Sequence, residues 1–83
     1  MANIAADVVR YFLVNRRDVV YLKFILEAYE GMATMTTVKR AGVIIRLTIP
    51  AGFTTEMQEL LTAISAEIPL QETAFDEEQE LRA

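Results

Sequence analysis

The sequence predicts an α+β domain whose strands and helices follow the order β-α-β-β-α-β. Three observations predict it. Four short segments are β-branched or alternate between apolar and polar residues, as strands do. Two longer segments carry apolar residues at helical spacing, and glycine or proline stands at most of the boundaries between segments. The length of 83 residues allows one domain, expected at residues 1–75 and followed by an acidic tail at residues 76–83.

The first half is expected to form a strand, a helix and a second strand. Residues 8–14 (VVRYFLV) are β-branched and aromatic and predict the first strand. Asn15 and Asp18 have the spacing of a capping box, so a helix is expected from there to Gly31, a residue type that commonly ends helices. The threonine-rich residues 32–38 predict the second strand.

The clearest alternation follows a hairpin turn predicted at residues 39–42 (KRAG). In the third strand, one set of side chains is expected to face the helices: Val43, Ile45, Leu47 and Ile49. The other set is expected to face away: Ile44, Arg46 and Thr48. Arg10 interrupts the first strand, and we expect it to mark the outer side there, shared with Phe12 and Val14. The outer face of the sheet is therefore expected to carry a patch of Phe12, Val14 and Ile44.

The remaining segments complete the pattern. A second helix is expected from a capping box at Thr55 and Gln58 to Pro69. Residues 70–75 predict the fourth strand, and the tail, with its four acidic residues, is expected to be flexible or loosely helical. The complete order resembles the ferredoxin-like split βαβ fold, an antiparallel sheet of four strands with both helices on one face. The strand order expected for that fold is 4-1-3-2.

The chain is unusually apolar for its size. Apolar residues make up 53 % of the sequence, and with the three glycines their share exceeds the roughly 45–50 % of ordinary soluble domains. The first helix has only a narrow polar stripe of Lys23, Glu27 and Glu30. Its flanks keep more apolar residues than one sheet can cover: Val20, Tyr21, Phe24 and Ala28. This helix and the outer patch of the sheet predict a homo-oligomer, with a dimer favoured. The alternative is that a small domain simply exposes some apolar side chains.

The composition excludes most catalytic chemistry. The chain contains neither cysteine nor histidine, which excludes disulfides, thiolate zinc sites and the commonest general base. Ser65, the only serine, has no imidazole partner. We therefore expect no enzyme, no catalytic residues, no metal and no cofactor. No apolar run approaches the roughly 20 residues of a membrane span, so no membrane partner is expected, and the cytoplasm is the default location.

Charge is divided between the two halves. Residues 10–46 carry a net charge of +4 and residues 47–83 carry −7. The expected topology brings four cations to one edge of the sheet: Arg16, Arg17, Lys39 and Arg40. That edge is a candidate site for a small anion, or an ordinary solvated rim. Binding of single-stranded RNA to an aromatic residue such as Phe12 is disfavoured, because the isoelectric point is about 4.7.

One stretch is similar to a known family. Leu-Lys-Phe-Ile-Leu-Glu at residues 22–27 and Tyr-Glu-Gly at residues 29–31 run into a threonine-containing strand. This stretch resembles the signature of a small bacterial family catalogued as domain of unknown function 4911. The resemblance implies a stand-alone domain with no assigned activity. The topology is also similar to ACT-type modules that bind amino acids, but residues 15–18 lack the glycine or proline of their first turn.

Overall fold

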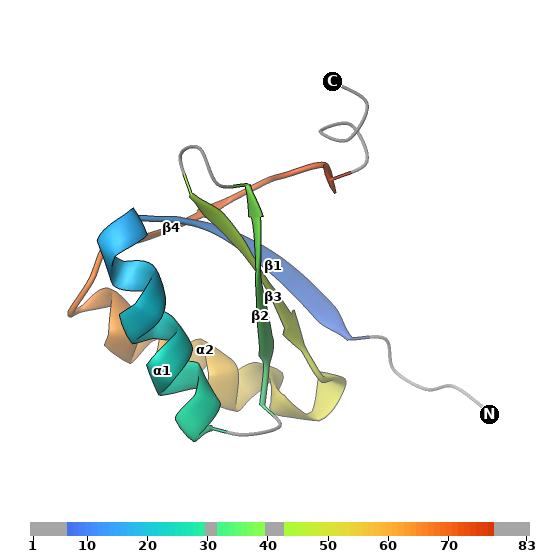
Figure 1. The fold of residues 1–83 in the computed structure, drawn as a ribbon. Coiled ribbons are helices and arrows are strands. Elements are labelled where there is room, and N and C mark those ends of the chain that lie inside the picture. The colour runs from blue at the N-terminus through green and yellow to red at the C-terminus, as the bar shows by residue number, and fades with distance from the viewer. Residues whose placement is uncertain (1–6, 30–31, 40–42, 78–83) are drawn as a thin grey trace.

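The computed structural model describes residues 7–29, 32–39 and 43–77. The strands are β1 (Val8–Val14), β2 (Thr34–Lys39), β3 (Ile44–Ile49) and β4 (Leu70–Thr73). The helices are α1 (Val19–Ala28) and α2 (Thr54–Ser65), each entered through one 3₁₀ turn, η1 (Arg16–Asp18) and η2 (Ala51–Phe53). The element order is the predicted β-α-β-β-α-β (Figure 1).

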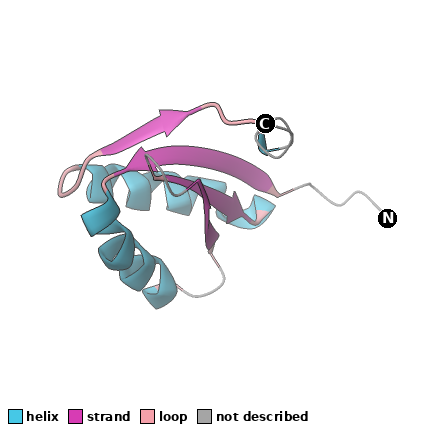
Figure 2. Cartoon of the chain, turned by 45° about the horizontal axis from the view of Figure 1, so that its top comes forward, coloured by secondary structure: helices cyan, strands magenta, loops and turns pink. Residues whose placement is uncertain are grey.

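The strands form one antiparallel sheet in the order β2-β3-β1-β4, which is the predicted 4-1-3-2 order viewed from the other edge. Figure 2 shows both helices on the same face of this sheet. The predicted α+β class and its ferredoxin-like arrangement are therefore confirmed. The central strands β1 and β3 have a neighbour on each side, whereas β2 and β4 lie at the edges of the described sheet.

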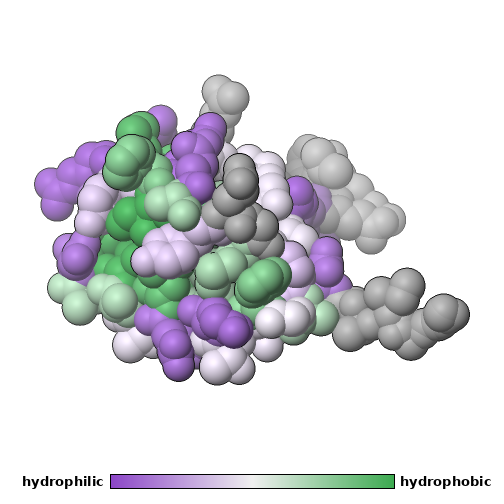
Figure 3. Space-filling model, turned by 90° about the horizontal axis from the view of Figure 1, so that it is seen from below, coloured by the Kyte–Doolittle hydropathy of each residue, from purple (hydrophilic) through white to green (hydrophobic). Residues whose placement is uncertain are grey.

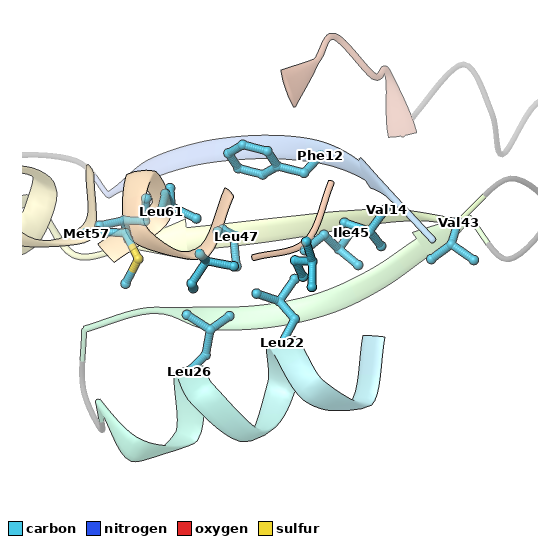
Figure 4. Packing of buried hydrophobic residues seen from close by; sticks show 12 residues of the cluster. Phe12, Val14, Leu22, Leu26, Val43, Ile45, Leu47, Met57 and Leu61 are labelled. Carbon is cyan, nitrogen blue, oxygen red and sulfur yellow. The ribbon is translucent and has the colours of Figure 1, made fainter. Parts of the chain in front are cut away.

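The core lies between the sheet and the two helices. Alternate residues of β3 point into it and are buried: Ile45, Leu47 and Ile49. They meet Leu22 and Leu26 from α1, which point toward the sheet in Figure 4. From α2 the core receives Met57, Leu61 and Ile64. The alternation predicted for the third strand is confirmed, because its apolar positions with period two coincide with the buried face.

β1 presents the side opposite to the predicted one. Phe12 pairs with Ile45 across the sheet, and both Phe12 and Val14 are buried in the core. The prediction that Phe12 and Val14 lie on the outer face is therefore wrong. Arg10 shares the helix-facing side of β1, and its guanidinium lies over the Phe12 ring at 5.3 Å from the centroid. A long arginine stem can lie on apolar surface while its charged head reaches the rim, so Arg10 did not mark the outer side.

Both predicted capping boxes are absent. Neither helix start has a side-chain hydrogen bond to its backbone. Asn15 Nδ2 instead lies 3.5 Å from Asp18 Oδ2, and Gln58 uses its amide on Arg10 and Thr62. The preceding 3₁₀ turns supply backbone hydrogen bonds at both starts, such as the one from Phe53 N to the Pro50 carbonyl. The predicted helix end at Gly31 lies outside the described residues, and β4 ends two residues earlier than predicted.

Candidate contact surfaces

The outward side of α1 is apolar and exposed. Val20 and Phe24 are 77 % and 71 % exposed, and they lie one helical turn apart, opposite the buried Leu22 and Leu26. Ala28 continues the same line by one further turn and is also exposed. We call Val20, Phe24 and Ala28 the α1 stripe. Figure 3 views the molecule from below and shows green, hydrophobic side chains gathered in its left half, the side on which the helices lie.

Tyr21 borders the α1 stripe on the side of α2. Its hydroxyl donates a hydrogen bond to a carboxylate oxygen of Glu67, just after the end of α2. This hydrogen bond raises the pKa of the Tyr21 hydroxyl. Tyr21 thus contacts its own chain through its polar end while its ring stays partly exposed. The prediction that Tyr21 takes part in an oligomer contact stays a prediction.

A shallow hollow continues the α1 stripe toward the start of the helix. It has a volume of about 370 Å³ and is lined by Arg16, Val19, Val20, Thr37 and Val43. The hollow joins the 3₁₀ turn before α1 to the ends of β2 and β3. Because Val20 belongs both to the hollow and to the stripe, the two form one continuous surface.

The predicted basic edge is assembled in part. Arg16 lines the hollow together with Thr37 of β2, and Lys39 pairs with Ile44 at the same end of the sheet. Arg17 is exposed beside Arg16, and Arg40 lies outside the described residues. Arg16 and Arg17 precede α1 and Lys39 ends β2, so all three residues lie toward the same end of the sheet. Anion binding there stays a prediction.

The outer face of the sheet carries a different apolar patch from the predicted one. Ile44 is half-buried on this face, as expected, and Leu13 lies opposite it on β1. Val9 pairs with Thr48 farther along the same two strands. On this face Leu13 is thus the cross-strand neighbour of Ile44, and Val9 lies farther along β1, beyond the Tyr11–Arg46 pair, whereas Phe12 and Val14 lie on the other face.

The outer face also carries polar contacts that the sequence does not predict. Tyr11 and Arg46 lie opposite each other on β1 and β3, and both contact the carboxylate of Glu77. The hydrogen bond from Tyr11, followed in size by the one from Arg46, lowers the pKa of Glu77. The hydrogen bond to Glu77 in turn raises the pKa of Tyr11. Arg46 was expected to face outward, but no pattern near Glu77 indicated that the chain returns there after β4.

A second ion pair joins β1, β4 and α2 at the rim of the core. Arg10 donates two hydrogen bonds to the Glu72 carboxylate at 2.9 and 2.8 Å, and a third at 2.9 Å to the side-chain oxygen of Gln58. The hydrogen bonds from Arg10 lower the pKa of Glu72. Because Phe12 lies under the guanidinium, this cluster covers one end of the core.

The described ranges hold no group of three acidic side chains placed to bind a metal ion. Neither described helix has the length and apolar character that crossing a membrane requires.

Comparison with protein families matches residues 12–68 to the model of a domain of unknown function, DUF4911. No curated protein and no solved structure shows significant similarity to the chain. The family match begins in β1 and ends after α2, so it includes the α1 stripe, the hollow and Arg46. It covers well over half of the sequence, and the chain belongs to the family of this domain of unknown function, DUF4911.

Proposed function

We propose that this protein is a non-enzymatic interaction module that self-associates as a dimer through the α1 stripe. The observation that carries the proposal is the exposure of Val20 and Phe24 on successive turns of a helix whose opposite side already fills the core. Isolated exposed apolar residues need no explanation, but a contiguous apolar surface favours a protein contact. We also propose a cytoplasmic location, since a chain without cysteine needs no oxidising compartment.

The charges beside the α1 stripe suit a second copy of the same helix. Lys23 and Glu27 are both exposed and lie four residues apart, along one border of the stripe. A two-fold axis between antiparallel helices, placed near the level of Ile25, would set Lys23 of each copy opposite Glu27 of the other. The two Phe24 side chains would then meet close to the axis. Self-complementarity of this kind is what a two-fold interface requires.

The size of the surface indicates a weak dimer. The ten residues of α1 span about 15 Å, which is short for the roughly 800 Å² per partner of a standard interface. The hollow next to Val20 and the neighbouring edge strand β2 can extend the contact. We therefore expect a dimer that dissociates on dilution.

The test is the variant Phe24→Glu, examined by sedimentation velocity over a concentration series. It is expected to weaken dimerisation more than tenfold, because two carboxylates would meet near the axis in place of two aromatic rings. Phe53→Glu is the matched control, since Phe53 is also an exposed phenylalanine but lies at the start of α2. A wild-type chain that stays monomeric at high concentration would refute the proposal, as would a Phe24→Glu chain that dimerises like wild type.

A small-anion sensor is the second candidate, and the observation that favours it is the hollow lined by Arg16 near Arg17 and Lys39. Inorganic phosphate is expected to raise the melting temperature if this edge binds anions, because a ligand of the folded state stabilises it. Replacing Arg16, Arg17, Lys39 and Arg40 with glutamine should abolish that shift. An unchanged melting temperature in millimolar phosphate would count against phosphate sensing.

A further inference from the structure

The outer face of the sheet holds a carboxylate between two side chains of the central strands. Arg46 Nη1 lies 2.8 and 2.7 Å from the two carboxylate oxygens of Glu77. The Tyr11 hydroxyl donates a hydrogen bond of 2.6 Å to one of these oxygens. Since Tyr11 and Arg46 are direct partners in the β1–β3 register, the backbone hydrogen bonds of the sheet fix their relative positions. Both side chains therefore project from the two central strands of the sheet, and rigid elements of this kind position a binding site precisely.

An aromatic contact accompanies the carboxylate. The Phe75 ring lies 5.7 Å from the Tyr11 ring, centroid to centroid, with the planes tilted by 53°. Tilted aromatic pairs at this distance are attractive. Tyr11 thus contacts the segment twice, through its ring with Phe75 and through its hydroxyl with Glu77. Together the two strands recognise an aromatic residue and a carboxylate spaced two residues apart.

The contact joins parts of the chain that are distant in sequence. Glu77 is 66 residues from Tyr11 and 31 from Arg46. β4 ends at Thr73, so only a short tether separates the last strand from Phe75. A short tether gives a segment a high effective concentration at a neighbouring site. The chain can therefore occupy this site with its own residues even where the contacts themselves are modest.

We propose that Tyr11 and Arg46 form a binding site for an acidic peptide that carries an aromatic residue two positions before a carboxylate, and that residues 75–77 of the chain occupy this site and restrict access to it. The chemistry of the occupant follows from the chain's own residues 75–77, whose Phe75 ring and Glu77 carboxylate contact Tyr11 and Arg46. Val9 and Leu13, both exposed on the same face of β1, extend the apolar surface that such a peptide would cover. The site is on the sheet face opposite the helices, so it is independent of the α1 stripe.

The test uses the full-length chain and a fluorescein-labelled peptide of residues 73–83 (TAFDEEQELRA), with binding measured by fluorescence anisotropy. Glu77→Lys is expected to bind the peptide at least tenfold more tightly than wild type, because a lysine beside Arg46 is repelled and leaves the site open. Glu59→Lys is the matched control, since it makes the same charge change at an exposed position of α2. It is expected to bind the peptide no more than twofold more tightly than wild type.

Two further variants, made in the Glu77→Lys chain, locate the binding. Arg46→Gln and Tyr11→Phe are each expected to weaken peptide binding at least fivefold. Tyr11→Phe keeps the ring and removes only the hydroxyl, so it remains informative if a thermal melt shows that Arg46→Gln does not fold. Equal peptide binding by the Glu77→Lys and Glu59→Lys chains would overturn the proposal. So would peptide binding that neither variant weakens, or a Glu77→Lys chain that binds single-stranded oligouridine but not the peptide.

Discussion

Phe12→Ala is expected to lower the free energy of unfolding by about 3–5 kcal/mol, the usual cost of removing a buried phenylalanine. Leu13→Ala, at the next position of β1, is expected to cost about 1 kcal/mol or less. The difference follows from exposure, since Phe12 is 5 % exposed and Leu13 is 39 % exposed. Urea unfolding of both variants, followed by circular dichroism, measures the two losses under identical conditions.

This pair of substitutions tests which side of β1 faces the helices. Successive side chains of a strand point to opposite faces, so a slip of one residue would exchange the buried and exposed sets. If Leu13→Ala cost as much as Phe12→Ala, the register between β1 and β3 would be in error. Tyr11 would then face the core, and the carboxylate site with Arg46 could not exist. The stability measurement is therefore also an independent check on the outer face.

β3 and β1 show how far the sequence determines which side of a strand is buried. In β3 the inward positions are isoleucine and leucine, and Arg46 and Thr48 stand between them, so the pattern has only one solution. β1 has apolar residues on both faces, with Phe12 and Val14 on one and Val9 and Leu13 on the other. Arg10 was the only asymmetric residue, and it lies on the apolar side because Glu72 and Gln58 bind its head group at the rim. Tertiary contacts, which a single sequence does not reveal, therefore determine which side of β1 is buried.

The α1 stripe and the Glu77 contact also differ in how far the sequence predicts them. The excess of apolar residues on α1 follows from local spacing alone, because every residue of the α1 stripe belongs to one helix. The Glu77 contact depends on where the chain travels after β4, and its partners are 31 and 66 residues away. An acidic tail is ordinarily a solvated segment, so its composition gave no reason to place a carboxylate on the sheet. Of the predicted tail, only the first two residues lie within the described part of the chain.

Leu22→Ala is expected to lower the stability of the monomer, and Phe24→Ala is expected to weaken dimerisation, although both residues lie on the same helix. Leu22 is fully buried between α1 and the sheet, so Leu22→Ala should lower the free energy of unfolding by about 2.7–5 kcal/mol. At about 4–8 °C per kcal/mol for a domain of this size, the melting temperature should fall by more than 10 °C. Phe24→Ala should change the unfolding free energy of the monomer by about 0.5 kcal/mol or less, because an exposed side chain loses little packing.

The same two substitutions are expected to differ in their effect on the proposed dimer. At protein concentrations where wild type sediments as a dimer, Phe24→Ala should sediment largely as a monomer, and its stability should no longer depend on concentration. Leu22→Ala, studied at a temperature where it is folded, should retain self-association, since its side chain faces the sheet and not the α1 stripe. A large loss of monomer stability in Phe24→Ala would show that Phe24 packs within its own chain. Both apolar sides of α1 would then pack within the chain, and self-association would need a surface other than the α1 stripe.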